Sequence, residues 1–252
     1  RYVNEANGLM RELDISVDTC DDDQDYYDIR SKLFLYHCKK ALADDKRLKH
    51  AYSNVINNFL ERVPVFKIYR YNLFKRSAYD AKLFHSLFKE KANEIYDKLY
   101  DYEANPYTLQ QWALCRAYLK QFKEAFSDID KALRQKPNNF SIRNTSAIIL
   151  FEANREELNA TGKQKRAEAM DILSECYKND KRKTYHANRF AEFAIEIFEI
   201  DKDSQYIEQA KKWIDEVLSN NDGILWYTKK YQKRLNEIYS SISANFGDIE
   251  KY

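Results

Sequence analysis

Turn-forming residues are scarce in this chain, and the scarcity restricts the fold more than any other feature of the sequence. The 252 residues include only 4 glycines and 3 prolines. Barrels, sandwiches and doubly wound α/β sheets need many tight turns, which these two residue types favour. Charged residues make up 33% of the chain and aromatic residues 15%. This combination is typical of amphipathic helices with bulky buried faces and charged outer faces, so we expect an all-α fold.

The distribution of charged and apolar residues divides the chain into successive regions. The first 25 residues carry eight acidic side chains against only Arg1 and Arg11. Apolar residues at helical spacing then predict helices that begin near Tyr26, Arg47 and Phe66. We expect four regions: an acidic leader at 1–25, an N-terminal helical region at 26–91, helical repeats at 92–223 and a C-terminal capping helix at 224–252.

One helix–turn–helix pattern lies between residues 106 and 139. Its large, small and aromatic positions fall on Leu114, Cys115, Tyr118, Ala125, Ile129, Ala132 and Pro137. Small residues let two helices approach closely, and large residues fill the space between successive hairpins. The pattern resembles the tetratricopeptide repeat (TPR), although its turn is short and lacks the family's glycine.

The same spacing recurs less closely upstream and downstream of this hairpin. The later copies fall on Ser146, Ala147, Leu150, Ala169, Leu173, Cys176, Phe193, Ala194, Ile197, Ala210, Ile214 and Val217, and a partial copy falls on Ala92, Tyr96 and Leu99. The resemblance implies an α-solenoid, because each TPR hairpin buries its apolar surface only by stacking on a neighbour. An insertion at 156–165 would lie at one edge, where it either contacts a partner or forms a tolerated surface loop.

The resemblance also implies a concave groove lined by the first helix of each hairpin. It places these side chains on the groove: Leu109, Trp112, Arg116, Lys120, Asn144, Ile148, Phe151 and Asn188. Tryptophan and arginine often anchor protein interfaces, so we expect Trp112 and Arg116 to be central to a partner-binding site. In the alternative interpretation, Trp112 packs against the neighbouring hairpin.

Recognisable catalytic motifs are missing from the sequence. It contains no P-loop, dinucleotide-binding, metalloprotease or nucleophile-elbow signature. No two of its four histidines stand at a spacing that suits a zinc site. We therefore expect a non-catalytic protein with no cofactor and no metal. The alternative is a helical ribonuclease, because Arg30 and His37 fit the permissive Arg–His pattern of the HEPN ribonucleases and lie about two helical turns apart.

The charge of the chain gives little reason to expect a nucleic acid or a membrane as partner, since the net charge is only +2. The segment at 65–76 interleaves aromatic and basic residues, which is a pattern found in binders of single-stranded nucleic acid. The same segment equally describes a buried helix with Lys and Arg side chains reaching the solvent. We expect a protein or peptide ligand, with single-strand nucleic-acid binding as a further alternative.

The stretch at 59–81, joined to the repeats, resembles the C-terminal sensor region of bacterial STAND-type and sirtuin-linked antiphage NTPases. That resemblance implies a ligand-sensing module whose partner is a phage protein or another domain of the same chain. The sequence begins at Arg1 and not at Met, so we expect a fragment of a longer protein. It has no signal peptide, no membrane-spanning run and no paired cysteine spacing, which predicts a cytoplasmic protein with reduced thiols.

Overall fold

The computed structural model describes residues 15–19, 25–29, 50, 80–102, 104–220 and 226–247. The chain divides into two compact units, which are residues 1–63 with 86–88 and residues 64–85 with 89–252. Arg30, His37 and the segment at 65–76 lie outside the described residues. The nuclease and nucleic-acid alternatives therefore remain predictions from the sequence.

The first unit contains an antiparallel pair of strands, β1 (Ile15–Thr19) and β2 (Asp25–Ile29). Their register places Val17 opposite Tyr27. Both strands contain β-branched or aromatic residues, which pack well on a pleated surface. These residues favour strand pairing although each strand also contains acidic residues. This pair corrects two expectations, because the chain is not all-α throughout and Tyr26 belongs to a strand and not to the start of a helix.

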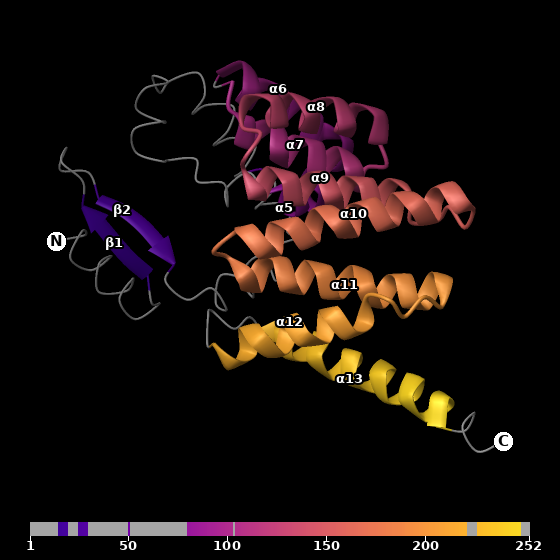
Figure 1. Cartoon of the computed structure of the whole chain (residues 1–252). Coiled ribbons are helices and arrows are strands. Elements are labelled where there is room, and N and C mark those ends of the chain that lie inside the picture. The colour runs from indigo at the N-terminus through magenta and orange to yellow at the C-terminus, as the bar shows by residue number, and fades with distance from the viewer. Residues whose placement is uncertain are drawn as a thin grey trace. The chain divides into compact units, whose positions relative to one another are not determined.

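Every element that the structure describes from residue 80 onward is a helix (Figure 1). These elements are α5 (Ala81–Phe88), the 3-10 turn η2 (Lys89–Lys91), α6 (Ala92–Tyr102), α7 (Pro106–Tyr118), α8 (Phe122–Gln135), α9 (Phe140–Ala153), α10 (Ala160–Asn179), α11 (Lys183–Asp201), α12 (Ile207–Ser219) and α13 (Trp226–Gly247). The predicted helical class is confirmed for this part of the chain.

Asparagine and lysine occupy several helix ends and turns where glycine is common in other proteins. The side chains of Asn105, Asn139 and Asn159 accept hydrogen bonds from the first backbone N–H groups of α7, α9 and α10. Lys120, in the turn after α7, has φ 61°, and Lys202, at the end of α11, has φ 56°. Both lysines adopt the left-handed conformation in which helices often end with glycine. The scarcity of glycine is therefore compatible with short connections between helices.

Helices that follow one another in sequence pack side by side. Helix α7 packs on α8, α9 on α10 and α11 on α12, and contacts also join α8 to α9, α10 to α11 and α12 to α13. The small residues of the repeat pattern are fully buried, namely Ala92, Cys115, Ala125, Ala132, Ala147, Ala169, Cys176, Ala194 and Ala210. Their burial is as the spacing predicted.

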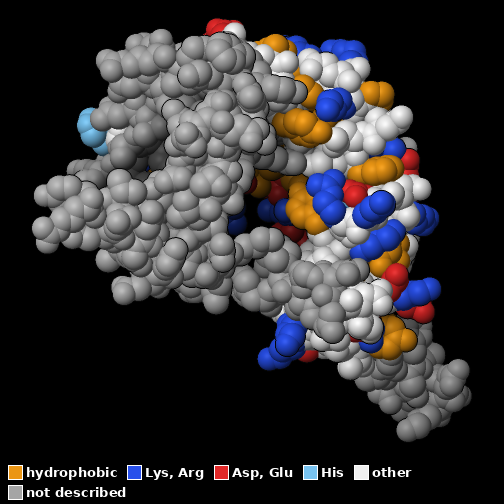
Figure 2. Space-filling view, turned by 90° about the vertical axis from the view of Figure 1, so that its left-hand side faces the viewer, with side chains coloured by type: hydrophobic (Ala, Val, Ile, Leu, Met, Phe, Trp, Pro, Cys, Tyr) orange, Lys and Arg blue, Asp and Glu red, His pale blue; other side chains and the backbone are white. Residues whose placement is uncertain are grey.

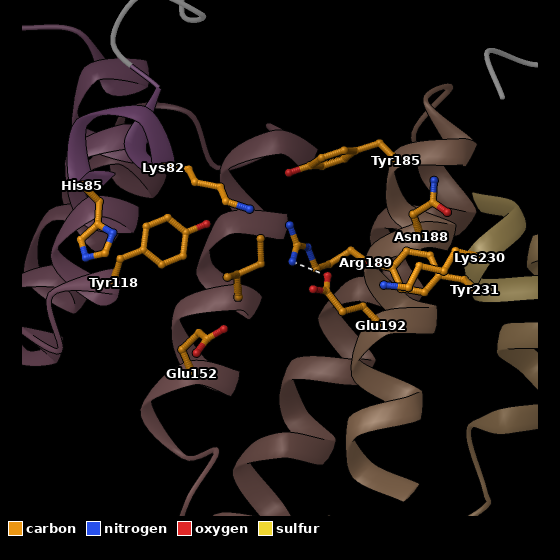
Figure 3. A pocket seen from close by; sticks show the side chains of 11 residues that line it. Lys82, His85, Tyr118, Glu152, Tyr185, Asn188, Arg189, Glu192, Lys230 and Tyr231 are labelled. Carbon is orange, nitrogen blue, oxygen red and sulfur yellow. Dashed lines mark hydrogen bonds and ion pairs between the residues drawn. The ribbon is translucent and has the colours of Figure 1, made fainter. Parts of the chain in front are cut away.

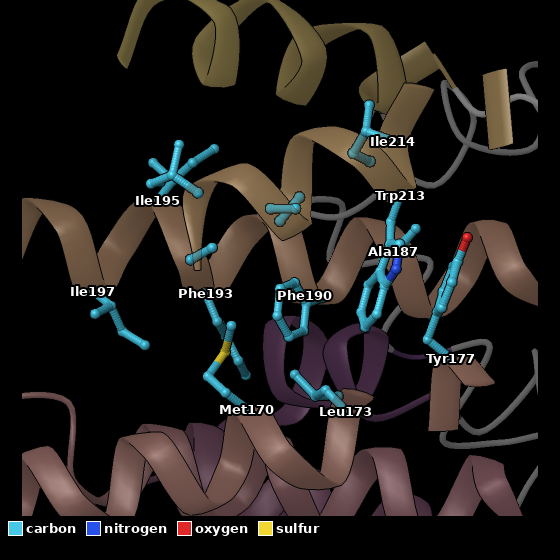
Figure 4. Packing of buried hydrophobic residues seen from close by; sticks show 14 of the residues in the cluster. Met170, Leu173, Tyr177, Ala187, Phe190, Phe193, Ile195, Ile197, Trp213 and Ile214 are labelled. Atoms are coloured by element: carbon cyan, nitrogen blue, oxygen red, sulfur yellow. The ribbon is translucent and has the colours of Figure 1, made fainter. Parts of the chain in front are cut away.

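Aromatic side chains fill the core between the later helices (Figure 4). The rings of Phe151 on α9 and Phe193 on α11 stack with their centroids 3.8 Å apart. Tyr177 on α10 and Trp213 on α12 stack at 3.9 Å. Each such pair stabilises the fold by about 0.5–1.5 kcal/mol beyond the burial of its area. The two stacked pairs therefore join helices that are two apart in the chain, α9 with α11 and α10 with α12.

Two buried thiols lie in this helical core. Cys115 and Cys176 are free cysteines, as expected. Burial raises the pKa of Cys115 to about 12 and that of Cys176 to about 11. Both groups stay protonated at neutral pH, so they act as small core residues and not as nucleophiles.

Candidate functional site

Alternate helices of the second unit line a pocket with a volume of about 510 Å³ (Figure 3). The side chains come from α5, α7, α9, α11 and α13. They are Lys82, His85, Tyr118, Ile148, Glu152, Tyr185, Asn188, Arg189, Glu192, Lys230 and Tyr231. The volume is in the range of ligand-binding sites, which are commonly about 300–1,000 Å³.

Helical spacing explains why one helix contributes so many of these residues. Tyr185, Asn188, Arg189 and Glu192 stand at positions i, i+3, i+4 and i+7 of α11. Residues at these intervals share one helix face, so all four point to the same side of α11. On α9, Ile148 and Glu152 are four residues apart for the same reason.

Four hydrogen-bond donors converge at one end of the pocket. The Lys82 amine, the Tyr118 and Tyr185 hydroxyls and the Arg189 guanidinium point toward one another in Figure 3. They come from three different helices, α5, α7 and α11. The start of α5 is held beside α7, because the Ala81 backbone N–H donates to Gln111 Oε1 at 3.0 Å. We call these four side chains the donor cluster.

The protonation states of the donor cluster favour hydrogen-bond donation. Burial raises the pKa of Tyr118 to about 12, against the opposing effect of the Arg189 charge. For Arg189, burial lowers the pKa, but Glu192 together with Tyr185, Tyr118 and Tyr231 outweighs this effect and holds the pKa above the ordinary value. The Tyr118 phenol is therefore neutral and the Arg189 guanidinium charged at neutral pH.

The opposite end of the site is acidic. Arg155 pairs with Glu152 and with Glu196, each at 2.9 Å between Nη2 and a carboxylate oxygen. Burial raises the pKa of Glu196 to about 7, since Glu192 and Glu152 add repulsion and Arg155 opposes the shift only in part. Arg189 is in turn paired with Glu192. The pocket therefore holds charges of both signs, most of them already paired.

Asn188, one of the residues that line the pocket, has an unsatisfied side-chain acceptor. Its side-chain Nδ2 donates to Thr228 Oγ1 of α13 at 2.9 Å, and the residue is only 4% exposed. Its Oδ1 is buried and has no hydrogen-bond partner among the described residues. An unpaired buried acceptor costs about 1–3 kcal/mol, which a ligand with an N–H group would offset.

Trp112 and Arg116, which the sequence placed on a binding groove, pack inside the fold. Trp112 is 7% exposed, and its Nε1 donates to Asn93 Oδ1 of α6 at 3.0 Å. Its ring stacks on Tyr96, and the Arg116 guanidinium lies 4.0 Å from the indole centroid and pairs with Asp128. Both side chains are committed to partners inside the fold, as the alternative interpretation held for Trp112.

Most of the other predicted groove residues are also buried. Leu109, Asn144 and Phe151 are each at most 1% exposed. Lys120 is exposed and lies in the turn after α7, 3.8 Å from Glu156. Of the eight predicted residues, Ile148 and Asn188 line the pocket.

The sequence contained a signal for the missed residues. Polar and aromatic side chains recur at i, i+3, i+4 and i+7 from Tyr185 to Glu192 on a helix whose other faces are apolar. A polar stripe of this kind on an otherwise buried helix marks the face that meets solvent or a ligand. The repeat resemblance does not use this stripe and therefore places the groove on other residues.

Other kinds of site find no support in the part of the chain that the structure describes. There, no group of three or more His, Cys, Asp or Glu side chains is arranged to hold a metal ion. None of the described helices has a stretch that is both long enough and apolar enough to cross a bilayer. In comparisons with known proteins, no family model, no curated protein and no solved structure matches the chain.

Proposed function

We propose that this chain is a non-catalytic recognition module, in which stacked TPR-like hairpins hold a peptide segment of a partner protein in the pocket. The pocket takes one helix from each of three successive helical hairpins, α7, α9 and α11, together with α5 and α13. An elongated site built from parallel rows of helices suits an extended ligand more than a compact one.

The observation that carries this proposal is the unpartnered Asn188 Oδ1. A peptide main chain offers an N–H donor at nearly every residue, and one such donor would satisfy this acceptor. Asn188 is fixed for the task, because its Nδ2 is engaged by Thr228 at 2.9 Å. The three tyrosines of the pocket, Tyr118, Tyr185 and Tyr231, supply the amphipathic contact area that is common in peptide-binding surfaces.

The surface charge also favours a protein partner. On the described face shown in Figure 2, basic, acidic and hydrophobic side chains are interspersed over the helices. A nucleic-acid-binding face usually carries a continuous basic stripe. Mixed charges suit a protein ligand, which offers both signs at fixed positions.

The test is to select peptides from a random display library against the chain and to measure the affinity of the enriched sequences. Asn188→Ala should weaken binding by roughly tenfold, because it removes one hydrogen bond in a buried site. Lys229→Gln is the matched control, since Lys229 is exposed on α13 beside the pocket residue Lys230 but does not line the pocket. Circular dichroism melting checks that both variants are folded.

Two results would contradict the proposal. One is a selection that enriches no sequence, and the other is a set of peptides that bind Asn188→Ala as tightly as the unaltered chain. We further propose that the module serves as the sensor part of a larger bacterial defence or signalling protein. The sequence resemblance of residues 59–81 and the repeats supports this context, and a phage protein or another domain of the same chain would then supply the peptide.

A further inference from the structure

The donor cluster has more hydrogen-bond donors than an uncharged peptide segment can use. We propose that it binds a phosphoryl group, so that the pocket recognises a phosphorylated side chain of the bound peptide. This inference rests on the proposed function, because the peptide is what brings the phosphoryl group into the pocket.

The number of donors fits a phosphoryl group. Lys82 offers three N–H groups, Tyr118 and Tyr185 one hydroxyl each, and Arg189 retains N–H groups beyond the Nη1 that faces Glu192. A carboxylate presents two oxygens in one plane, whereas a phosphoryl group presents three that diverge. Donors that converge from α5, α7 and α11 approach from different directions, as divergent oxygens require.

The charge balance also fits. Glu192 is paired with Arg189, and Glu152 is paired with Arg155. Within the described residues, no ion pair or hydrogen bond engages the amines of the two lining lysines, Lys82 and Lys230. Among the charged lining residues, Lys82, Arg189 and Lys230 outnumber Glu152 and Glu192 by one. This excess of positive charge favours a phosphoryl group, which carries roughly −1.5 to −2 at neutral pH.

The remainder of the pocket explains why the phosphoryl group would arrive on a peptide. A cavity of about 510 Å³ is far larger than one phosphate ion needs. Ile148, Asn188 and Tyr231 also line it, and these side chains suit a side-chain stem and a main-chain N–H. The donor cluster would hold the anion while the rest of the wall holds the segment that carries it.

The experiment is a fluorescence-anisotropy titration of the chain with arrayed degenerate peptides. Each peptide has a central phosphoserine, phosphothreonine or phosphotyrosine, and each is paired with its unphosphorylated and its glutamate-substituted counterpart. Inorganic phosphate and phenyl phosphate serve as competitors. We expect at least one phosphorylated set to bind roughly tenfold or more tightly than both of its counterparts, since hydrogen bonds to charged groups are the strong ones.

Substitutions in the donor cluster then test whether the phosphoryl group binds in the pocket. Lys82→Gln, and the double variant Tyr118→Phe with Tyr185→Phe, should each weaken phosphopeptide binding by roughly tenfold while leaving the affinity for the unphosphorylated peptide unchanged. The phenylalanine substitutions remove only the hydroxyls and keep the rings, so folding should be retained. Lys229→Gln should have no effect, because Lys229 is outside the pocket.

The outcomes separate this inference from the proposed function. Peptides that bind equally well with and without phosphate would overturn the inference and leave the recognition function intact. Phosphopeptide binding that survives the Lys82 and tyrosine variants would also overturn it, because the anion would then bind elsewhere. Inorganic phosphate that binds through the donor cluster, with no peptide binding more tightly, would retain the anion chemistry but overturn the peptide ligand and the proposed function together.

Discussion

The indole of Trp112 is joined to Asn93, with Nε1 donating to Oδ1 at 3.0 Å across the contact between α7 and α6. The Arg116 guanidinium lies over the same ring, 4.0 Å from its centroid. Trp112 therefore stabilises the packing of two helices and is not free to anchor a ligand. Substitution of Trp112 should therefore change the stability of the fold.

Trp112→Ala should lower the free energy of unfolding by about 3–5 kcal/mol, as large-to-small changes of buried aromatic residues do. Urea unfolding followed by circular dichroism measures the change. Asn93→Ala removes the acceptor of the Trp112 hydrogen bond but keeps the indole, and it also removes the bonds of Asn93 to Gln121 and Arg116. It should cost about 1–3 kcal/mol, which is less than the loss of the buried ring. If Trp112→Ala lost peptide binding but kept its unfolding midpoint, the groove first expected from the sequence would have to be restored.

Arg166 should be a second residue on which stability depends. It is 1% exposed, forms an ion pair with Asp201 at 2.9 Å, and donates to the carbonyl oxygens of Asn154 and Glu157. Arg166→Met should cost about 3–5 kcal/mol, because it leaves a nearly buried carboxylate without its partner. Thermal unfolding compares it with Lys165→Met, which removes an exposed ion pair and should change stability by less than about 1 kcal/mol. Equal effects of the two substitutions would refute this role of Arg166.

The raised pKa of Glu196 predicts that the stability of the fold decreases as the pH rises. Burial raises its pKa from 4.5 to about 7, so the folded chain binds this proton more tightly than the unfolded chain does. The stability that the carboxyl contributes is therefore fully present below pH 4.5 and is lost as the pH rises to about 7. Glu196→Gln should gain about 1 kcal/mol over the unaltered chain at pH 8 relative to pH 4, after allowance for solvent screening.

Urea unfolding of both proteins across this pH range measures the difference for Glu196. Glu199→Gln is the control, since Glu199 is exposed on the same helix and should give a nearly constant offset. A difference between Glu196→Gln and the unaltered chain that did not change with pH would contradict this prediction, because it would show that the pKa of Glu196 is the same in the folded and the unfolded chain.

The sequence predicted the helical packing well where the signal is local. Small residues such as Ala125 and Ala132 recur at helical spacing and are fully buried. Closely packed helices leave room only for small side chains at their contact, so this spacing predicts the packing. The strand pair was missed, because Val17 and Tyr27 belong to runs of only five residues within an acidic stretch, and charge dominated our interpretation.

The pocket was harder to predict, because its position depends on how each hairpin is rotated against the next. Periodicity shows which face of α11 is buried, but not which neighbour covers it. Trp112 finds its partner Asn93 nineteen residues upstream, and this pairing follows no local pattern. Only the structure shows that Tyr118 from α7 and Arg189 from α11 face the same cavity.

The hydrogen bond between Asn188 and Thr228 couples the pocket to the last described helix. Thr228 is fully buried, and Lys230 and Tyr231 of the same helix line the pocket. A ligand held by these groups binds best when α13 is docked, so by thermodynamic reciprocity an occupied pocket must also hold α13 in place. Amide protons of α13 should then exchange more slowly when the ligand is bound. Binding in the pocket would therefore change the stability of the last described helix.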